Sequence, residues 1–366
     1  MTGTHMTDAH ITASRIAGSH VIGSRAFPRT HRMPCARRAH GMTLVELMIA
    51  MLLGMIVVGS ASAIFISNRQ TYRATESLGR VQESGRMSFE LMARDIREGA
   101  GNPCGKNLPI ANVLDNPTAN WWSDWGVGIV GYDGAIATPG LPFGAAPQQR
   151  VAGTDAIELK SADSASARVI VNHQPASATM FLNTVNHDFT DEDILMICDN
   201  RQAAIFQVTN ASPGTNTNVV HNRGGSANPG NCTKGLGLPV VCTANGTSYA
   251  YGPNSMVTRM RSVRWYIGRN PNGGNSLFRS TMTSSSGSIA AQPQEIVEGV
   301  NNMTLQYLLR DTGDYVDAGA IPANRWRDVV AVRVNLALAS RDRAGVNGAA
   351  LQRTLDHTVT LRNRMQ

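Results

Sequence analysis

The sequence lacks the short motifs by which many enzymes are recognised. It contains no H-E-x-x-H pair, no G-x-S-x-G turn, no P-loop and no G-x-G-x-x-G after a strand. Beyond residue 41 the histidines are His173, His187, His221 and His357, and none forms a metal-ligand pair in sequence. Because catalysis requires convergent functional groups, we expect no enzyme, no cofactor and no metal site.

Charge is also scarce and unevenly placed. Charged residues make up 16 % of the 366-residue chain and hydrophobic residues 42 %, a composition typical of a folded protein. The formal net charge is +7, but residues 1–41 hold six arginines and one acid. The remainder therefore carries only about +2, which does not indicate a nucleic-acid-binding protein.

The chain has five cysteines, one before and four after a long uncharged segment. Cys35 is the first, and the later four are Cys104, Cys198, Cys232 and Cys242. An even number beyond a membrane segment favours disulfides in an oxidising compartment, and the spacing does not match a zinc site. Three pairings are open, with buried free thiols as the alternative. We favour Cys232–Cys242 as a local link and Cys104–Cys198 as a long-range one.

No residue from Leu47 to Asn68 carries a charge, and about 20 such residues suffice to cross a bilayer as a helix. The basic segment before this run places the N-terminus in the cytoplasm. An ordinary signal peptide cleaved near Ala63 is the alternative. The apolar run is longer than such a peptide needs, and Glu46 stands at its start.

The string GMTLVELM, residues 41–48, resembles the type IV prepilin cleavage motif. The resemblance implies that a membrane peptidase cuts after Gly41 and methylates the new amine of Met42. It also implies that Glu46 pairs with the terminal amine of a neighbouring subunit during assembly. A carboxylate attracts an ammonium far more strongly in low dielectric than in water. The leader would be residues 1–41, with Met33 as an alternative translation start.

The helical pattern continues beyond the uncharged run, which predicts a helix from Met42 to Arg97 followed by a Gly/Pro stop. One apolar or small stripe consists of Leu78, Val81, Gly85, Phe89, Met92 and Ile96. The charged residues Glu76, Arg80, Glu83, Arg94 and Asp95 are expected mostly elsewhere on the helix. The stretch NRQTYR…RDIREGAG, within residues 68–101, resembles the PilW family of minor pilins.

Strand patterns dominate the rest of the chain. We expect strands at Asp155–Lys160, Ala167–Asn172, Asp193–Asp199, Ala203–Thr209, Met256–Gly268, Leu277–Arg279, Trp326–Ala339 and Thr354–Arg364. Residues 294–309 are expected to begin helical or irregular and to end as a strand, and much of 106–190 is unassigned. The fold class is α+β and pilin-like: a long N-terminal helix packs on an antiparallel sheet with long loops. The expected segments are 1–41, 42–68, 69–98, 99–255 and 256–366, the last two being a loop-rich part and a sheet part of the head.

Three local features of the sequence each have a functional and a structural interpretation. The acidic segment from His187 to Asp193 lacks calcium-loop spacing, so a solvated turn is favoured over a cation site. Trp121, Trp122 and Trp125 are expected in a satellite core, with a partner contact as the alternative. A weak DNA-binding candidate consists of Arg259, Arg261, Arg264 and Arg269, for which a solvated strand face is the simpler interpretation.

By resemblance, the chain is a minor pilin needed for type IV pilus assembly, twitching motility and attachment. Its implied partners are other minor pilins, the major pilin, a tip adhesin, the prepilin peptidase and the inner-membrane assembly platform. It would lie in the bacterial inner membrane with a periplasmic head and then enter the fibre, with the tip as one location. The alternatives are a type II secretion pseudopilin, a DNA-uptake pilin and a membrane-tethered periplasmic enzyme.

Overall fold

The computed structural model describes residues 41–105, 108–224, 228–285 and 288–364. The leader expected over residues 1–41 therefore lies outside the described residues except for Gly41. The chain divides into two compact units, Met1–Ser62 and Ala63–Gln366.

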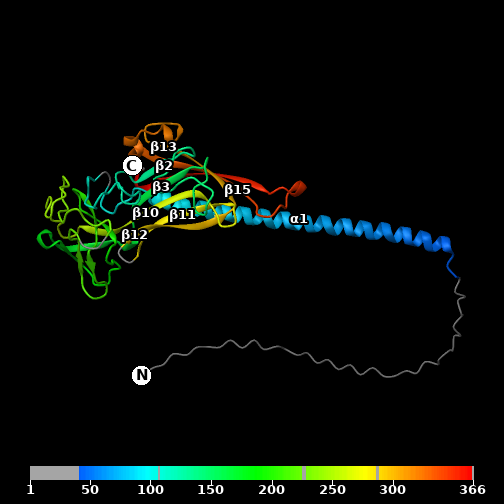
Figure 1. The fold of residues 1–366 in the computed structure, drawn as a ribbon, viewed down its shortest axis with the longest axis horizontal. Helices are drawn as coiled ribbons and strands as arrows, with labels where there is room; N and C mark the ends of the chain where they lie inside the picture. Colours follow the sequence, from blue (N-terminus) through cyan, green and yellow to red (C-terminus); the bar gives the residue numbers. More distant parts are fainter. Residues whose placement is uncertain (1–40, 106–107, 225–227, 286–287, 365–366) are drawn as a thin grey trace, which may run out of the picture. The chain divides into compact units, whose positions relative to one another are not determined.

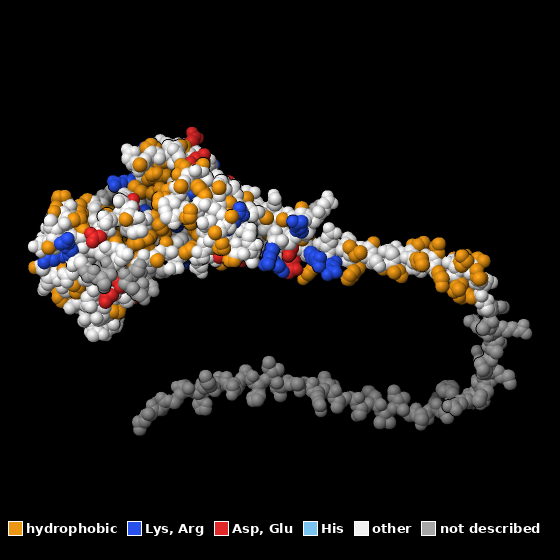
Figure 2. All heavy atoms as spheres, viewed as in Figure 1, with side chains coloured by type: hydrophobic (Ala, Val, Ile, Leu, Met, Phe, Trp, Pro, Cys, Tyr) orange, Lys and Arg blue, Asp and Glu red, His pale blue; other side chains and the backbone are white. Residues whose placement is uncertain are grey.

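The helix α1 spans Leu44–Glu98 and is 55 residues long. Its side chains up to Ser62 are exposed, and they are almost all apolar or small. Figure 2 shows this hydrophobic covering on the N-terminal part of the helix, with charged side chains gathered further along. By length and composition, α1 could cross a membrane, and it is the one such helix among the described residues.

From Ala63 onward, α1 belongs to the head unit and buries one stripe. Val81, Gly85, Met92 and Ile96 of the predicted stripe are buried, while Leu78 and Phe89 are half-buried. A side chain at Gly85 would collide with Leu355 of strand β16 (Gln352–Thr360), so glycine allows the close approach of this strand. These contacts fix the helix against the sheet.

One helix prediction is wrong. Asp95 was expected away from the buried stripe, yet its side chain is only 3 % exposed. It lies next to Ile96 and one turn from Met92, so it falls within the buried sector. Its burial is possible because cationic and N–H donors on two strands face it.

Within the described residues, twelve strands form one sheet, whose main path runs β1-β7-β6-β10-β4-β5-β9-β8. Strands β3 and β11 also pair with β10, β2 pairs with β3, and β12 pairs with β11. All pairs are antiparallel except the parallel pair β1–β7. The strands are β1 (Ile110–Asn112), β2 (Ile129–Tyr132), β3 (Ala156–Ala162), β4 (Arg168–Gln174), β5 (Thr179–Leu182), β6 (Ile194–Cys198), β7 (Ala203–Gln207), β8 (Asn210–Ala211), β9 (Asn218–Val220), β10 (Met256–Arg269), β11 (Asn275–Ser285) and β12 (Ser288–Glu298).

A second, antiparallel sheet has the order β14-β13-β15-β16. Its strands are β13 (Val300–Leu309), β14 (Tyr315–Asp317), β15 (Val329–Ala339) and β16 (Gln352–Thr360). Short 3-10 helices lie at η1 (Ser164–Ser166), η2 (Pro175–Ser177), η3 (Ala318–Ala320), η4 (Ala323–Asp328), η5 (Val346–Gly348) and η6 (Arg362–Arg364). Figure 1 shows the head part of α1 running beside β10, β11 and β15.

The observed strands match most of the expected ones. Residues 294–298, which were expected to be helical or irregular, belong to β12 and pair with β11, with a bulge where the register shifts between Leu277 and Phe278. Strand β10 pairs with β3, β4 and β6, which all precede it in sequence. The long-range pairing of β10 joins the two parts of the head.

The main hydrophobic core brings three layers together. It contains Met92 and Ile96 of α1, Trp265 of β10 and Val332 of β15. A second core lies around β5, β6, β7 and β9, remote in sequence from α1. The helix is therefore part of the head's principal core, and its orientation depends on contacts with both sheets.

Candidate assembly site

The cleavage motif lies at the start of α1. Gly41, Met42 and Thr43 are exposed and precede the first helical residue, Leu44. The Thr43 hydroxyl accepts a hydrogen bond from the N–H of Glu46 at 3.2 Å, and the Thr43 carbonyl accepts from the N–H of Leu47 at 3.1 Å. Thr43 is thus the helix cap, and the predicted scissile peptide lies in exposed, non-helical chain.

Glu46 is exposed in the first turn of the helix, four residues after Met42. Two roles are consistent with this position. A glutamate three residues after a capping threonine can complete a capping box and interacts favourably with the helix dipole. It can also pair with an ammonium of another subunit, as the prepilin resemblance implies. The described residues show no hydrogen bond or ion pair to its carboxylate.

The other end of α1 is joined to the sheet by Asp95. Its carboxylate accepts from Arg261 Nη2 at 2.6 Å, from Trp265 Nε1 at 2.9 Å and from Arg279 Nε at 2.8 Å. The two arginines and the tryptophan come from β10 and β11, so one buried carboxylate connects the helix to two strands. Glu98, one turn later, accepts from Arg261 Nη1 at 2.9 Å.

This network was not predicted from the sequence. The available signal was weak: an acid within one turn of two buried apolar positions, and arginines alternating along a strand that also contains a tryptophan. What the sequence could not supply was the register that aligns Asp95 with residues more than 160 positions away.

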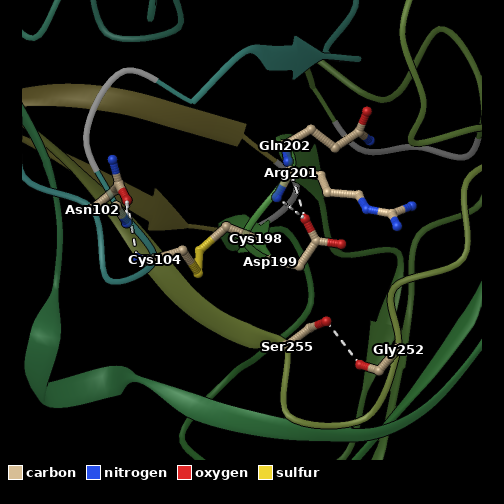
Figure 3. The surroundings of a disulfide bond; sticks show 9 residues. Asn102, Cys104, Cys198, Asp199, Arg201, Gln202, Gly252 and Ser255 are labelled. Atoms are coloured by element: carbon tan, nitrogen blue, oxygen red, sulfur yellow. Dashed lines mark hydrogen bonds between the residues drawn. A yellow bond between two sulfur atoms is a disulfide. The ribbon is translucent and has the colours of Figure 1, made fainter.

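The structure forms both disulfides that we favoured. Cys104 is bonded to Cys198 and Cys232 to Cys242, with Cα–Cα distances of 5.9 and 4.9 Å. The first disulfide joins the segment just after α1 to the end of β6 (Figure 3).

Side chains on either side of the first disulfide stabilise the turns that it joins (Figure 3). Asn102 accepts hydrogen bonds from the N–H groups of Cys104 and Gly105 at 3.0 and 2.9 Å. Asp199 accepts from the N–H groups of Arg201 and Gln202 at 2.8 and 3.0 Å. The chain that follows the helix is therefore held in a defined conformation.

The four arginines considered for DNA binding do not form a free basic surface. Arg259 pairs with Asp193 at 2.9 Å and with Asp188 at 3.1 Å, and Arg261 belongs to the Asp95 network. Their guanidinium groups therefore compensate carboxylates of the head itself.

The remaining two arginines are also engaged within the head. Arg264 is 3 % exposed and donates to Glu158 at 3.0 Å, while Arg269 donates to Asn275 at 2.7 Å. Arg264 also lies 4.1 Å from the centre of the Trp121 ring. The DNA-binding prediction gains no support from this geometry.

The acidic segment and the tryptophan group have structural roles. His187 and Asp193 are buried, and Asp188 and Asp193 bind Arg259, so the segment is more ordered than the solvated turn we favoured. The described residues contain no group of three or more potential metal ligands. The three neighbouring tryptophans, Trp121, Trp122 and Trp125, are buried in a satellite core, as expected.

Asp155 and Arg150 are buried charged residues whose pKa values are shifted. Burial raises the pKa of Asp155 to about 6, although its carboxylate accepts from the N–H of Leu305 at 2.7 Å. Because Asp155 precedes β3 and Leu305 lies in β13, this contact connects the two sheets. Arg150, fully buried, donates to carbonyls of the 132–154 segment, and burial lowers its pKa to about 10.

A buried histidine pair lies in the second core. The Nε2 atoms of His173 and His221 are 3.1 Å apart, and His173 Nδ1 accepts from the N–H of Tyr251 at 3.2 Å. His173 must therefore carry its proton on Nε2 and donate it to His221. Burial lowers the pKa of His173 to about 4 and that of His221 to about 3.

The fold and the N-terminal motif together define the class of protein. A long apolar helix, preceded by a prepilin-type cleavage sequence, continues into the core of a largely antiparallel β domain. This is an α+β pilin-like protein, anchored in a membrane by its N-terminal helix. It associates with other components of a pilus.

Two family comparisons refine the class. Residues 36–62 match the family described as the prokaryotic N-terminal methylation motif. Residues 264–364 match the family described as type IV pilus-assembly protein W. The two matches support a PilW-type minor pilin, in agreement with the resemblance, and both imply a structural role. No protein in the curated set matches the chain.

Proposed function

We propose that this chain is a minor pilin required for the initiation of type IV pilus assembly. The peptidase cleaves after Gly41, the amine of Met42 is methylated, and Glu46 pairs with such an amine on an adjacent subunit. Through the fibre, the protein supports twitching motility and surface attachment. Two half-helices serve two purposes: residues 42–68 assemble within the membrane, and residues 69–98 carry the head.

The observation that carries this proposal is the contrast between the two ends of α1. The Glu46 carboxylate has no hydrogen bond or ion pair within the described chain, whereas the Asp95 carboxylate accepts from three side chains of the head. An ionised acid beside an apolar segment is costly unless it finds a cation. Assembly with a second processed subunit provides that cation.

The partners follow from this role. The chain would contact other minor pilins and the major pilin through its apolar half-helix, and the assembly platform in the inner membrane. A tip adhesin would contact the head. We place the head in the periplasm before assembly, where both disulfides can form.

The test compares Glu46→Ala with Glu46→Gln in a deletion strain. Glutamine keeps the shape and the capping ability of glutamate but not its charge. We expect both variants to be inserted and cleaved normally and both to be poorly incorporated into sheared pili. N-terminal sequencing should give methylated Met42 for the wild type.

Wild-type incorporation of Glu46→Gln would overturn the ammonium-pairing role and favour the capping role. Protein recovered with its leader, or trimmed near Ala63, would refute the prepilin assignment itself. A pseudopilin of type II secretion is the second candidate, because such proteins resemble the same layout. Deletion would then abolish protein secretion while leaving pili unchanged.

A further inference from the structure

A groove with a volume of about 490 Å³ lies where α1 ends. One side is the last turn of the helix, another is the segment after it, and a third is the C-terminal helix η6. The groove is lined by Arg94, Arg97, Glu98, Gly101, Asn102, Pro103, Ala162, Ser164, Arg362 and Asn363.

The groove carries an excess of positive charge. Arg94, Arg97 and Arg362 are exposed, and the single acid, Glu98, is already bound by Arg261 at 2.9 Å. Arg94 makes only a long contact of 3.5 Å with Glu98. The guanidinium groups of Arg97 and Arg362 have no ion pair or hydrogen bond among the residues that the structure describes. Two or three guanidinium groups are therefore available to an incoming anion.

The walls of the groove are held in place before any ligand arrives. Asn102 is fixed by accepting from the N–H groups of Cys104 and Gly105, and Cys104 is bonded to Cys198 (Figure 3). A rigid wall reduces the entropy that binding must overcome.

On the opposite side, η6 is anchored by Leu361, which precedes it, and by its last residue, Arg364. Leu361 is fully buried, and Arg364 donates to the carbonyls of Trp326 and Val329. Burial lowers the pKa of Arg364 to about 10. Arg362, between these two anchors, is presented to solvent at a defined position.

The chemistry of the groove fits carboxylates best. Guanidinium groups bind carboxylates through paired N–H donors, and the neighbouring amide and hydroxyl groups can complete the contact. Among the described residues, no aromatic side chain lines the groove, and these residues therefore offer no stacking surface for nucleotide bases. Along α1, 30 residues separate Asn68 from Glu98, or ~45 Å of helix, which places the groove far from lipid headgroups.

We propose that this groove binds an acidic segment of a neighbouring pilus subunit through its Asp or Glu side chains. The inference relies on the proposed function in taking the partner to be a pilus subunit. The binding itself can be measured without pilus assembly.

The experiment uses the mature full-length protein in nanodiscs of zwitterionic lipid. The probe is a fluorescein-labelled peptide of sequence GEDGEDG, and its matched control is GQNGQNG. We expect salt-sensitive binding of the acidic peptide alone. Arg97→Gln and Arg362→Gln should each weaken binding about threefold, and the double variant about tenfold. Neither change removes an ion pair, so the melting temperature should not change.

Arg343→Gln is the control, because Arg343 is exposed and does not line the groove. Equal binding of the two peptides, or an equal loss in the control variant, would overturn the inference. The variants are also tested for binding to duplex DNA and to phosphatidylglycerol vesicles. If such binding depends on Arg97 and Arg362 and the acidic peptide does not bind, the groove belongs to another ligand and the inference is overturned.

Pilus assembly gives an independent measurement. Reduced incorporation of the double variant into sheared pili supports a pilus subunit as the partner, whereas full incorporation overturns that identity. Absent peptide binding would end the groove inference but leave the assembly role intact. That role is tested separately by the Glu46 variants.

Discussion

Replacing Asp95 by asparagine preserves the size of the side chain but removes the charge that holds α1 against the sheet. The carboxylate is 3 % exposed and accepts from Arg261, Trp265 and Arg279 at 2.6 to 2.9 Å. Asparagine retains one acceptor oxygen and turns an N–H₂ group toward the remaining donors. Two guanidinium groups then lose their shared counter-charge.

The expected cost follows from the burial of the partners. Removing one partner of a fully buried ion pair costs about 3–5 kcal/mol. Arg261 and Arg279 are 27 % and 22 % exposed, so they can recover part of their hydration. We therefore expect Asp95→Asn to lower the free energy of unfolding by about 2–4 kcal/mol. Glu98→Gln is the matched control, since Glu98 is 44 % exposed and should cost under about 1 kcal/mol.

The assay is urea unfolding of the mature full-length protein in detergent, followed by tryptophan fluorescence. Trp265 lies within the network and reports on its loss. A cost below about 1 kcal/mol for Asp95→Asn, or an equal cost for Glu98→Gln, would refute the assigned role of the buried carboxylate.

Three further predictions concern pH and the disulfides. The pKa of Asp155 is raised from 3.8 to about 6 in the folded state, so the folded state binds this proton more tightly than the unfolded state. This group therefore makes the head more stable as pH falls from about 7 to about 4. Asp155→Asn should remove this contribution to the pH dependence of the free energy of unfolding, measured with urea. The histidine pair acts oppositely: with pKa values lowered to about 4 and 3, His173 and His221 reduce stability as pH falls below about 6.5, so His173→Gln/His221→Gln should flatten the acid-side loss. Replacing Cys104 and Cys198 by serine should cost about 2 kcal/mol more than removing the second disulfide, since the separations are 94 and 10 residues; equal costs in urea unfolding would contradict this.

The sequence was most informative where one periodicity or one local motif determined the outcome. The uncharged run and the apolar stripe predicted α1 to within two residues at its start and one at its end. Alternation predicted β10 and β15, because strands of 14 and 11 residues carry a clear pattern. Strands β1 and β2, of three and four residues, are too short to show one.

The candidate site was only half predictable for a related reason. The residues around Gly41 and Glu46 act through their spacing in sequence, which can be seen directly. Asp95 acts through partners on β10 and β11, and the groove combines residues 94–103 with residues 362–363. Such sites depend on strand register and on the path of the last residues, which no local pattern specifies.

The polar groups of this chain also separate contacts within the subunit from contacts between subunits. Asp95 lies among donors that already satisfy it, so it has no capacity left for a neighbour. Glu46 at the start of α1 and Arg97 and Arg362 in the groove have no such partners among the described residues. Charges of this kind contribute little to the stability of one subunit, because exposed groups are well hydrated. They gain strength only when another molecule excludes water from them. Contacts with other subunits should therefore concentrate at these two places. We expect Glu46 to bind a cation of another subunit, and Arg97 and Arg362 to bind an anion.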